Sequence, residues 1–319
     1  MRKATRVLLP GFLAIAAFAA LAQDASVTPA QKSAGKEITS ELLRSHIRFL
    51  SSDLLEGRGP ATRGDQLAEA YVQSQLEGLG LEPGAPGGGW IQKVPLVGIK
   101  RTSSEPAIFK SGRGSLSGVL GENFVAVSGV QKPESKIDAA EIVFVGYGIV
   151  APEYRWDDYK DADLKGKVLL VMNNDPEGSP AEPDLFAGKT RLWYGRWDYK
   201  YLMAARKGAA GAIVIHTTPS AGYGWQVVQT SWAGERFELP DDGAPRVAAK
   251  MWATEELAKR IVELGGKDLD SLGASAENRS FKPVPLGVTV SVALTNAIGQ
   301  KESGNVIGVL PGSDPKRRG

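Results

Sequence analysis

The spacing of apolar residues predicts two helices near the start of the chain. The first begins after Thr39 or Ser40, either of which can cap a helix. Its apolar residues fall on one face: Leu42, Leu43, Ile47 and Leu50. The second collects its apolar residues in the same way and ends at Gly80, a residue suited to a helix C-terminus: Leu67, Tyr71, Val72, Leu76 and Leu79. A polar loop, 51–64, separates the two helices.

After these helices the pattern changes to short β runs divided by glycine, proline and aspartate turns. An alternating stretch at 90–97 predicts the first strand. Further strands are predicted at 124–127, 141–145, 168–172, 212–215 and 288–292. Two helices interrupt them, at 199–207 and 254–264. The run Asn305–Leu310, closed by Pro311-Gly312, predicts a buried strand followed by a tight turn. The fold class is therefore mixed α/β, with a β-rich central part.

The N-terminus has the three parts of a secretion signal. Arg2, Lys3 and Arg6 form a basic start, Val7–Leu21 is apolar, and Ala20-Leu21-Ala22 offers small residues for cleavage. The alternative is a membrane anchor, but about 15 apolar residues fall short of the roughly 20 that span a bilayer. We therefore expect residues 1–22 to be a signal peptide, 23–36 a flexible leader, and the protein to be exported to the periplasm or the extracellular space.

Composition narrows the range of partners. The chain has 38 basic and 36 acidic side chains and no long run of either sign, so neither nucleic acid nor an anionic membrane is an expected partner. Cysteine is absent, which excludes disulfides, thiolate metal sites and a cysteine nucleophile. It also removes the usual bacterial lipid anchor, so we expect no membrane anchor after signal cleavage.

The usual catalytic motifs are missing. There is no Gly-x-Ser-x-Gly elbow, no phosphate-binding Gly-x-x-x-x-Gly-Lys and no His-Glu-x-x-His. Residues 146–151 superficially match a dinucleotide loop, but no apolar helix follows, so a tight strand exit is the favoured interpretation. The histidines, His46 and His216, are 170 positions apart, and a zinc centre needs about three clustered ligands. We interpret both as structural or partly exposed.

Two further groups of residues leave alternatives open. Acidic clusters could bind calcium but lack the spacing of its 12-residue loop, so solvated turns are favoured: Asp157, Asp158, Asp161, Asp163, Asp241 and Asp242. A concentration of aromatic residues could form a recognition face, but packing in a core is the favoured interpretation: Trp193, Tyr194, Trp197, Tyr199, Tyr201, Tyr223 and Trp225.

Three segments together resemble metallopeptidase family 28, the di-zinc aminopeptidases, in the variety that carries an inserted protease-associated domain. The first runs from LSSDLLEGRG at 50–59 to LGLEP at 79–83. The second includes FVGYGIVAP at 144–152, WDDY at 156–159, LKGKV at 164–168 and AARKGAAGAIVIH at 204–216. The third is GNVIGVLPGSD at 304–314.

This resemblance implies a domain organisation. Residues 37–112 begin a peptidase domain, 115–292 form the protease-associated domain, and 300–319 return to a peptidase domain that is incomplete in this chain. In the family, the two zinc ions share a bridging water and a glutamate handles the proton. All of those ligands lie beyond the position that corresponds to Gly319, so we assign no catalytic, cofactor-binding or metal residue here and expect no bound zinc.

Two functions follow as expectations. The first is the N-terminal portion of an exported zinc-dependent aminopeptidase, which acts on peptides or proteins when complete and is inactive as it stands. The second is a secreted, non-catalytic protein whose protease-associated domain binds peptides or another protein.

Overall fold

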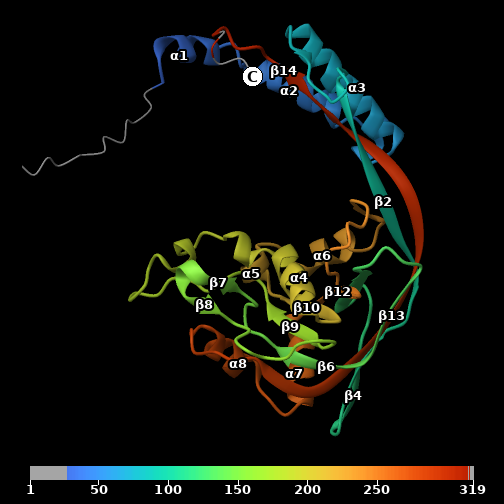
Figure 1. Cartoon of the computed structure of the whole chain (residues 1–319), viewed down its shortest axis with the longest axis vertical. Coiled ribbons are helices and arrows are strands. Elements are labelled where there is room, and N and C mark those ends of the chain that lie inside the picture. Colours follow the sequence, from blue (N-terminus) through green and yellow to red (C-terminus); the bar gives the residue numbers. More distant parts are fainter. Residues whose placement is uncertain (1–26, 315, 317–319) are drawn as a thin grey trace, which may run out of the picture. The chain divides into compact units, whose positions relative to one another are not determined.

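The computed structural model describes residues 27–314 and 316, and its fold is mixed α/β as predicted. Contacts within the chain divide it into two units, one ending at Gly57 and one beginning at Arg58 (Figure 1). Residues 1–26, which hold the predicted signal peptide, lie outside the described part. No helix in the described ranges is long and apolar enough to cross a membrane.

The first unit is helical. Helix α1 (Pro29–Gly35) lies in the segment predicted to be a flexible leader, and it begins at a capping box formed by Thr28 and Gln31. Helix α2 (Ser40–Leu50) matches the prediction, with the Thr39 side chain accepting from the Leu42 backbone N–H. A short turn of 3₁₀-helix, η1 (Asp53–Arg58), follows. Apolar side chains of α2 are largely exposed, among them Leu42, Leu43 and Ile47.

The second unit begins with helix α3 (Arg63–Gly78), capped by Thr62. Most of its strands join one sheet, which contains ten strands within the described chain. Its main path runs β11-β2-β13-β6-β9-β10-β12-β5, and the β3–β4 hairpin branches from β13. The bounds are β2 (Ile91–Ser104), β3 (Ala107–Ser111), β4 (Gly114–Gly118), β5 (Phe124–Ser128), β6 (Glu134–Phe144), β9 (Val168–Met172), β10 (Gly211–His216), β11 (Arg236–Glu238), β12 (Ala249–Thr254) and β13 (Val284–Val306).

Strand β13 is 23 residues long and pairs with β2, β3 and β6. Its first half pairs with β6 and β3, and its second half pairs antiparallel with β2 from Leu294 opposite Ser104 to Val306 opposite Ile91. It therefore extends from the predicted protease-associated segment into the predicted re-entry segment. The domain boundaries themselves stay a prediction.

Most of the predicted strand at 305–310 is present, but the prediction that it is buried is wrong. Strand β13 ends at Val306, and β14 (Gly308–Val309) pairs only with the two residues of β1 (Glu82–Pro83). The side chain of Leu310 is 74% exposed. Within the described chain, the start of the run pairs with β2 and its end pairs only with the short β1, which leaves Leu310 uncovered.

Four adjacent strands, β6, β9, β10 and β12, run parallel. Strands β9 and β10 are buried on both faces, which accounts for the near-continuous apolar runs in their sequences. One core lies between the sheet and helices α7 (Glu255–Leu264) and α8 (Leu269–Ala276). The other lies on the opposite face, against α4 (Trp197–Arg206) and α6 (Trp225–Ser231) (Figure 1).

Short elements occupy the loops at the carboxyl ends of these strands. They are β7 (Val150–Ala151), η2 (Pro152–Tyr154), β8 (Trp156–Asp157), η3 (Leu185–Ala187), η4 (Trp193–Gly195) and α5 (Thr218–Ala221). The glycine turn after β6 is a tight strand exit, as predicted. Gly146 and Gly148 both have positive φ, and a side chain on Gly146 would crowd Ala276 and Phe281.

Candidate ligand-binding cavity

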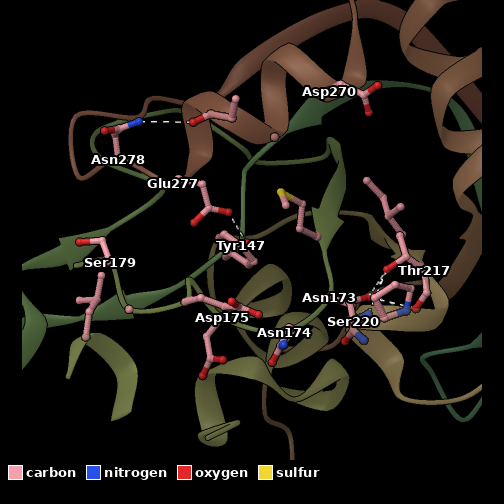
Figure 2. Close-up of a pocket in the computed structure, with 18 of the residues that line it drawn as sticks. Tyr147, Asn173, Asn174, Asp175, Ser179, Thr217, Ser220, Asp270, Glu277 and Asn278 are labelled. Atoms are coloured by element: carbon pink, nitrogen blue, oxygen red, sulfur yellow. Dashed lines mark hydrogen bonds between the residues drawn. The ribbon is translucent and has the colours of Figure 1, made fainter. Parts of the chain in front are cut away.

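A cavity of about 940 Å³ opens beyond the carboxyl ends of β9 and β10, between α8 and the loop that follows β9 (Figure 2). This is where open α/β sheets bind ligands, because loops from neighbouring parallel strands converge there. The residues that form its wall are Tyr147, Trp156, Met172, Asn173, Asn174, Asp175, Glu177, Gly178, Ser179, Glu182, Leu185, Ile215, Thr217, Pro219, Ser220, Glu255, Leu269, Asp270, Gly273, Ala274, Glu277, Asn278 and Arg279.

The cavity is strongly acidic. Among the described residues that line it, six are carboxylates and one is a cation: Asp175, Glu177, Glu182, Glu255, Asp270, Glu277 and Arg279. The guanidinium of Arg279 is already paired, since it makes two hydrogen bonds to the Glu182 carboxylate at 2.5 and 3.0 Å. It also donates to the Tyr154 carbonyl. Arg279 therefore offsets Glu182 and leaves the other carboxylates of the wall uncompensated by a lining residue.

Two of these carboxylates carry hydrogen bonds from the wall itself. The Tyr147 hydroxyl donates to Glu277 Oε1 at 2.5 Å (Figure 2). Burial, with the Glu277 hydrogen bond second, raises the pKa of Tyr147 well above its ordinary value, so the phenol stays protonated and continues to donate. Asp175 accepts from the Leu192 backbone N–H at 3.1 Å, and burial raises the pKa of this carboxyl.

The floor of the cavity is held by Lys200, whose side chain is 1% exposed. Its ammonium group donates to three backbone carbonyls, those of Tyr147 at 2.6 Å, Asn174 at 2.7 Å and Tyr194 at 2.7 Å. These satisfy all three of its protons. Burial lowers the pKa of Lys200 to about 7, with the nearby Asp158 carboxylate acting in the opposite direction. Tyr147 and Asn174 line the cavity, so Lys200 fixes two of its walls from behind.

Asp158 corrects a prediction, because it is buried rather than part of a solvated turn. Its side chain is 1% exposed and accepts from the Ile149 N–H at 2.9 Å and from the Trp156 indole N–H at 2.8 Å. Burial raises its pKa to about 7, and these two hydrogen bonds act against that shift. The other acidic side chains of these loops fit the prediction better, since Asp161, Asp163, Asp241 and Asp242 are exposed.

Asn173 offers the cavity a side-chain amide that no neighbouring residue uses. It follows β9 directly, is 5% exposed and lies in the cavity wall (Figure 2). Within the described chain its side-chain amide makes no hydrogen bond. The amide is therefore available to a ligand, as both a donor and an acceptor.

The histidines lie outside the cavity wall. His216 is buried at the end of β10, where its Nε2 contacts the Tyr223 carbonyl at 3.0 Å and burial lowers its pKa. His46 is half-buried on α2, in the other unit. No three His, Cys, Asp or Glu side chains of the described residues are grouped so that they could hold a metal ion.

The predicted aromatic group packs mainly as a core, the favoured interpretation. Tyr199 and Tyr201 are buried on α4, and their neighbours Tyr194, Trp197, Tyr223 and Trp225 pack against the same core. Trp193 alone of this group is largely exposed. None of them lines the cavity.

Pattern reasoning missed the residues that do form the site. Asn173 and Glu277 belong to no motif. Asp175 and Lys200 stand in Asn174-Asp-Pro and Tyr199-Lys-Tyr, two further stretches that carry the resemblance, but no role was assigned to them. One signal was present: the run Asn-Asn-Asp directly follows the apolar strand 168–172, at an end where parallel strands place their binding loops. This run indicates a binding site only if the strand lies in a parallel sheet, and the pairing of the strands was not predicted.

Comparison with known proteins identifies no family. No family model matches the chain, and no curated protein matches it. Among solved structures, the chain is similar to an aminopeptidase from Aneurinibacillus sp. strain AM-1, with 18% sequence identity and a TM-score of 0.38. The match covers 88% of this chain and 50% of that chain, so this chain spans about half of its length. A similarity at this level establishes no function.

The three carbonyls bound by Lys200 generate a prediction. Lys200→Met leaves them without their donor and should lower the free energy of unfolding by roughly 3 kcal/mol, since each buried acceptor left unpaired costs about 1 kcal/mol or more. Lys207→Met, at the end of the same helix, removes only a contact over the Tyr159 ring and should cost less than about 1 kcal/mol. Urea denaturation of both variants checks this, and equal losses would contradict the role given to Lys200.

A second prediction concerns pH. The pKa of Asp158 rises on folding from 3.8 to about 7, so between these values the folded chain keeps a proton that the unfolded chain releases. The contribution of Asp158 to the free energy of unfolding is fully present below about pH 4. It declines as the pH rises to 7, by up to about 1.4 kcal/mol per pH unit. Asp158→Asn cannot titrate. The difference in unfolding free energy, wild type minus variant, should therefore fall from pH 4 to pH 7, and a constant difference would refute the assignment.

Proposed function

We propose that this chain is the N-terminal part of an exported zinc-dependent aminopeptidase, and that it is inactive as it stands. The proposal starts from the three segments that resemble metallopeptidase family 28, in their order along the chain. Export is proposed from the basic, apolar and small-residue parts of the N-terminus. The substrate of the complete enzyme would be a peptide or protein with a free N-terminus.

One structural observation carries the proposal. The first and third of those segments are more than 200 residues apart, yet they contact each other. The Ser303 hydroxyl donates to Asp65 at 2.7 Å, the Gly304 N–H donates to Glu69 at 2.7 Å, and β14 pairs with β1. This is what two parts of one domain, interrupted by an insertion, are expected to do. It supports an inserted protease-associated domain between them.

Zinc ions in the complete family enzyme supply a polarised carbonyl and an activated water. The described residues of this chain do not fit that role, since they offer no group of three ligands. What the chain does offer is the acidic cavity, which favours a second candidate function. In that alternative, the protein is exported and non-catalytic, and its β-rich part binds a peptide or protein.

The proposal predicts that the purified chain has no aminopeptidase activity of its own. After dialysis, metal analysis should find well under one zinc per chain, and leucine p-nitroanilide should not be hydrolysed above background, because a catalytic zinc needs about three protein ligands. Near-stoichiometric zinc together with chelator-sensitive hydrolysis would contradict it.

The two candidate functions are separated by the coding sequence after the codon for Gly319. If the chain is the first part of an aminopeptidase, that sequence should encode an apolar strand that ends in His-x-Asp within about 20 residues, the length of one strand and its turn. Further acidic ligands and a histidine should follow at later strand ends. Sequencing this region tests it, and an unrelated gene without these motifs in any frame would favour the non-catalytic binding protein.

A further inference from the structure

The unpaired amide of Asn173 indicates that the cavity is built to hold a polar ligand. The side chain is buried, lies in the cavity wall and has no hydrogen-bond partner among the described residues. Its amide faces the cavity, so it can hydrogen-bond to a polar group of a ligand that enters there. Two neighbouring polar side chains of the wall are already paired with each other, since the Thr217 hydroxyl donates to the Ser220 hydroxyl at 2.8 Å.

The charge of the wall sets the sign of that ligand. Asp270 lies in α8 and Glu277 caps its C-terminal end, while Asp175 comes from the loop after β9 (Figure 2). Glu177 lies in the same loop as Asp175. Lys259 pairs with Asp270 at 3.2 Å and with Glu255 at 3.1 Å, but these are partly exposed contacts that solvent weakens. Carboxylates face the cavity from two sides, so a cation is favoured there and an anion is repelled.

The spacing of the carboxylates and the apolar residues of the wall favour an organic cation over a metal ion. A metal ion needs ligands within about 2.0–2.6 Å of one point, and the described carboxylates form no such group. The cavity is also large, and apolar side chains form part of its wall: Met172, Leu185, Ile215, Pro219 and Leu269. Apolar walls with a few convergent polar groups suit a ligand that has an aliphatic stem and a charged head.

We propose that this cavity binds an organic cation, an ammonium or guanidinium group on an aliphatic chain, as in lysine and arginine side chains. The stem packs on Met172 and Leu269, and the head donates to the Asn173 side-chain oxygen and to the carboxylates of Asp270 and Glu277. Binding of this cation requires no metal ion and breaks no covalent bond. The site goes beyond the proposed function and does not require it, because its ligand is defined by the cavity alone.

The test is a calorimetric titration of the full, zinc-free chain at about 0.15 M salt, where long-range attraction is screened. The probes are the blocked peptide acetyl-Ala-Ala-Lys-Ala-Ala-amide, its neutral norleucine analogue, spermidine and calcium chloride. Blocked ends leave the lysine side chain as the only cation of the peptide. We expect saturable binding of the lysine peptide, and binding of the norleucine peptide at least about tenfold weaker, since a charge-assisted hydrogen bond is lost.

Three variants and one control locate the site. Asn173→Leu keeps the volume and removes the amide, and it should weaken lysine-peptide binding at least about tenfold without lowering the melting temperature. Glu277→Gln removes one charge and should weaken binding in the same direction. Gly273→Leu extends from α8, where an added Cβ would meet only Met172 at 3.8 Å, so it should fill the cavity and abolish binding while the chain stays folded. Glu263→Gln, on an exposed position of α7, is the matched control and should change nothing.

The outcomes separate the sources of the cation. Binding of the lysine peptide, reduced by the three variants, supports the proposal with a peptide as the source, whereas binding of spermidine alone supports it with a free polyamine as the source. Equal affinity for the norleucine peptide, equal loss in the Glu263 control, displacement by stoichiometric calcium, or no binding of either cation overturns it. Because no probe is cleaved and no zinc is present, failure here leaves the aminopeptidase proposal unaffected.

Discussion

The ammonium group of Lys200 is the constraint on which the site depends. Removing a charge from water is costly, and a buried cation persists only where it is paired or fully hydrogen-bonded. Here the three protons meet three carbonyls, and these belong to segments far apart in the sequence, at Tyr147, Asn174 and Tyr194. The loops after β6 and β9 and the turn before α4 must therefore converge on one point. The lowered pKa of Lys200 records how completely solvent is excluded there.

The cavity follows from this convergence. With the loop after β9 tied down at Asn174, its neighbour Asn173 is held in the wall, and Tyr147 is positioned to donate to Glu277 at the end of α8. The acidic wall is thus assembled from two layers of the fold, the strand-end loops and α8. Asp158, buried beside Trp156, supports the same loops from the other side of Lys200.

The periodicity of apolar residues predicted an element well where those residues lie on one face of a helix or form an unbroken run in a strand. Helix α2, strand β9 and helix α7 lie within a residue or two of their predicted positions. Long-range pairing was out of reach, so β2 and β13 extend well past the predicted strands, each stabilised by the other. The run 305–310 was predicted to be buried from its composition alone, although burial depends on what covers it.

The site was harder to predict, for a physical reason. Asp158 and Lys200 are ordinary charged residues by sequence, and only the folded structure shows that both are buried. Asn173 stands out only because it lacks a partner, a property that no local pattern carries. The histidines, which sequence reasoning considered first as ligands, lie elsewhere, with His216 packed among aromatic rings. The sequence predicted the strand ends where a site belongs but not the residues that form it.

The Asn173 amide and the carboxylates of Asp270 and Glu277 form the proposed site for the head of an organic cation. A crystal structure of the chain with the blocked lysine peptide tests this most directly. The account predicts the lysine nitrogen about 3 Å from the Asn173 side-chain oxygen, with its stem along Met172 and Leu269. Peptide bound at any other surface, with Asn173 still unpaired or bonded only to water, would contradict it.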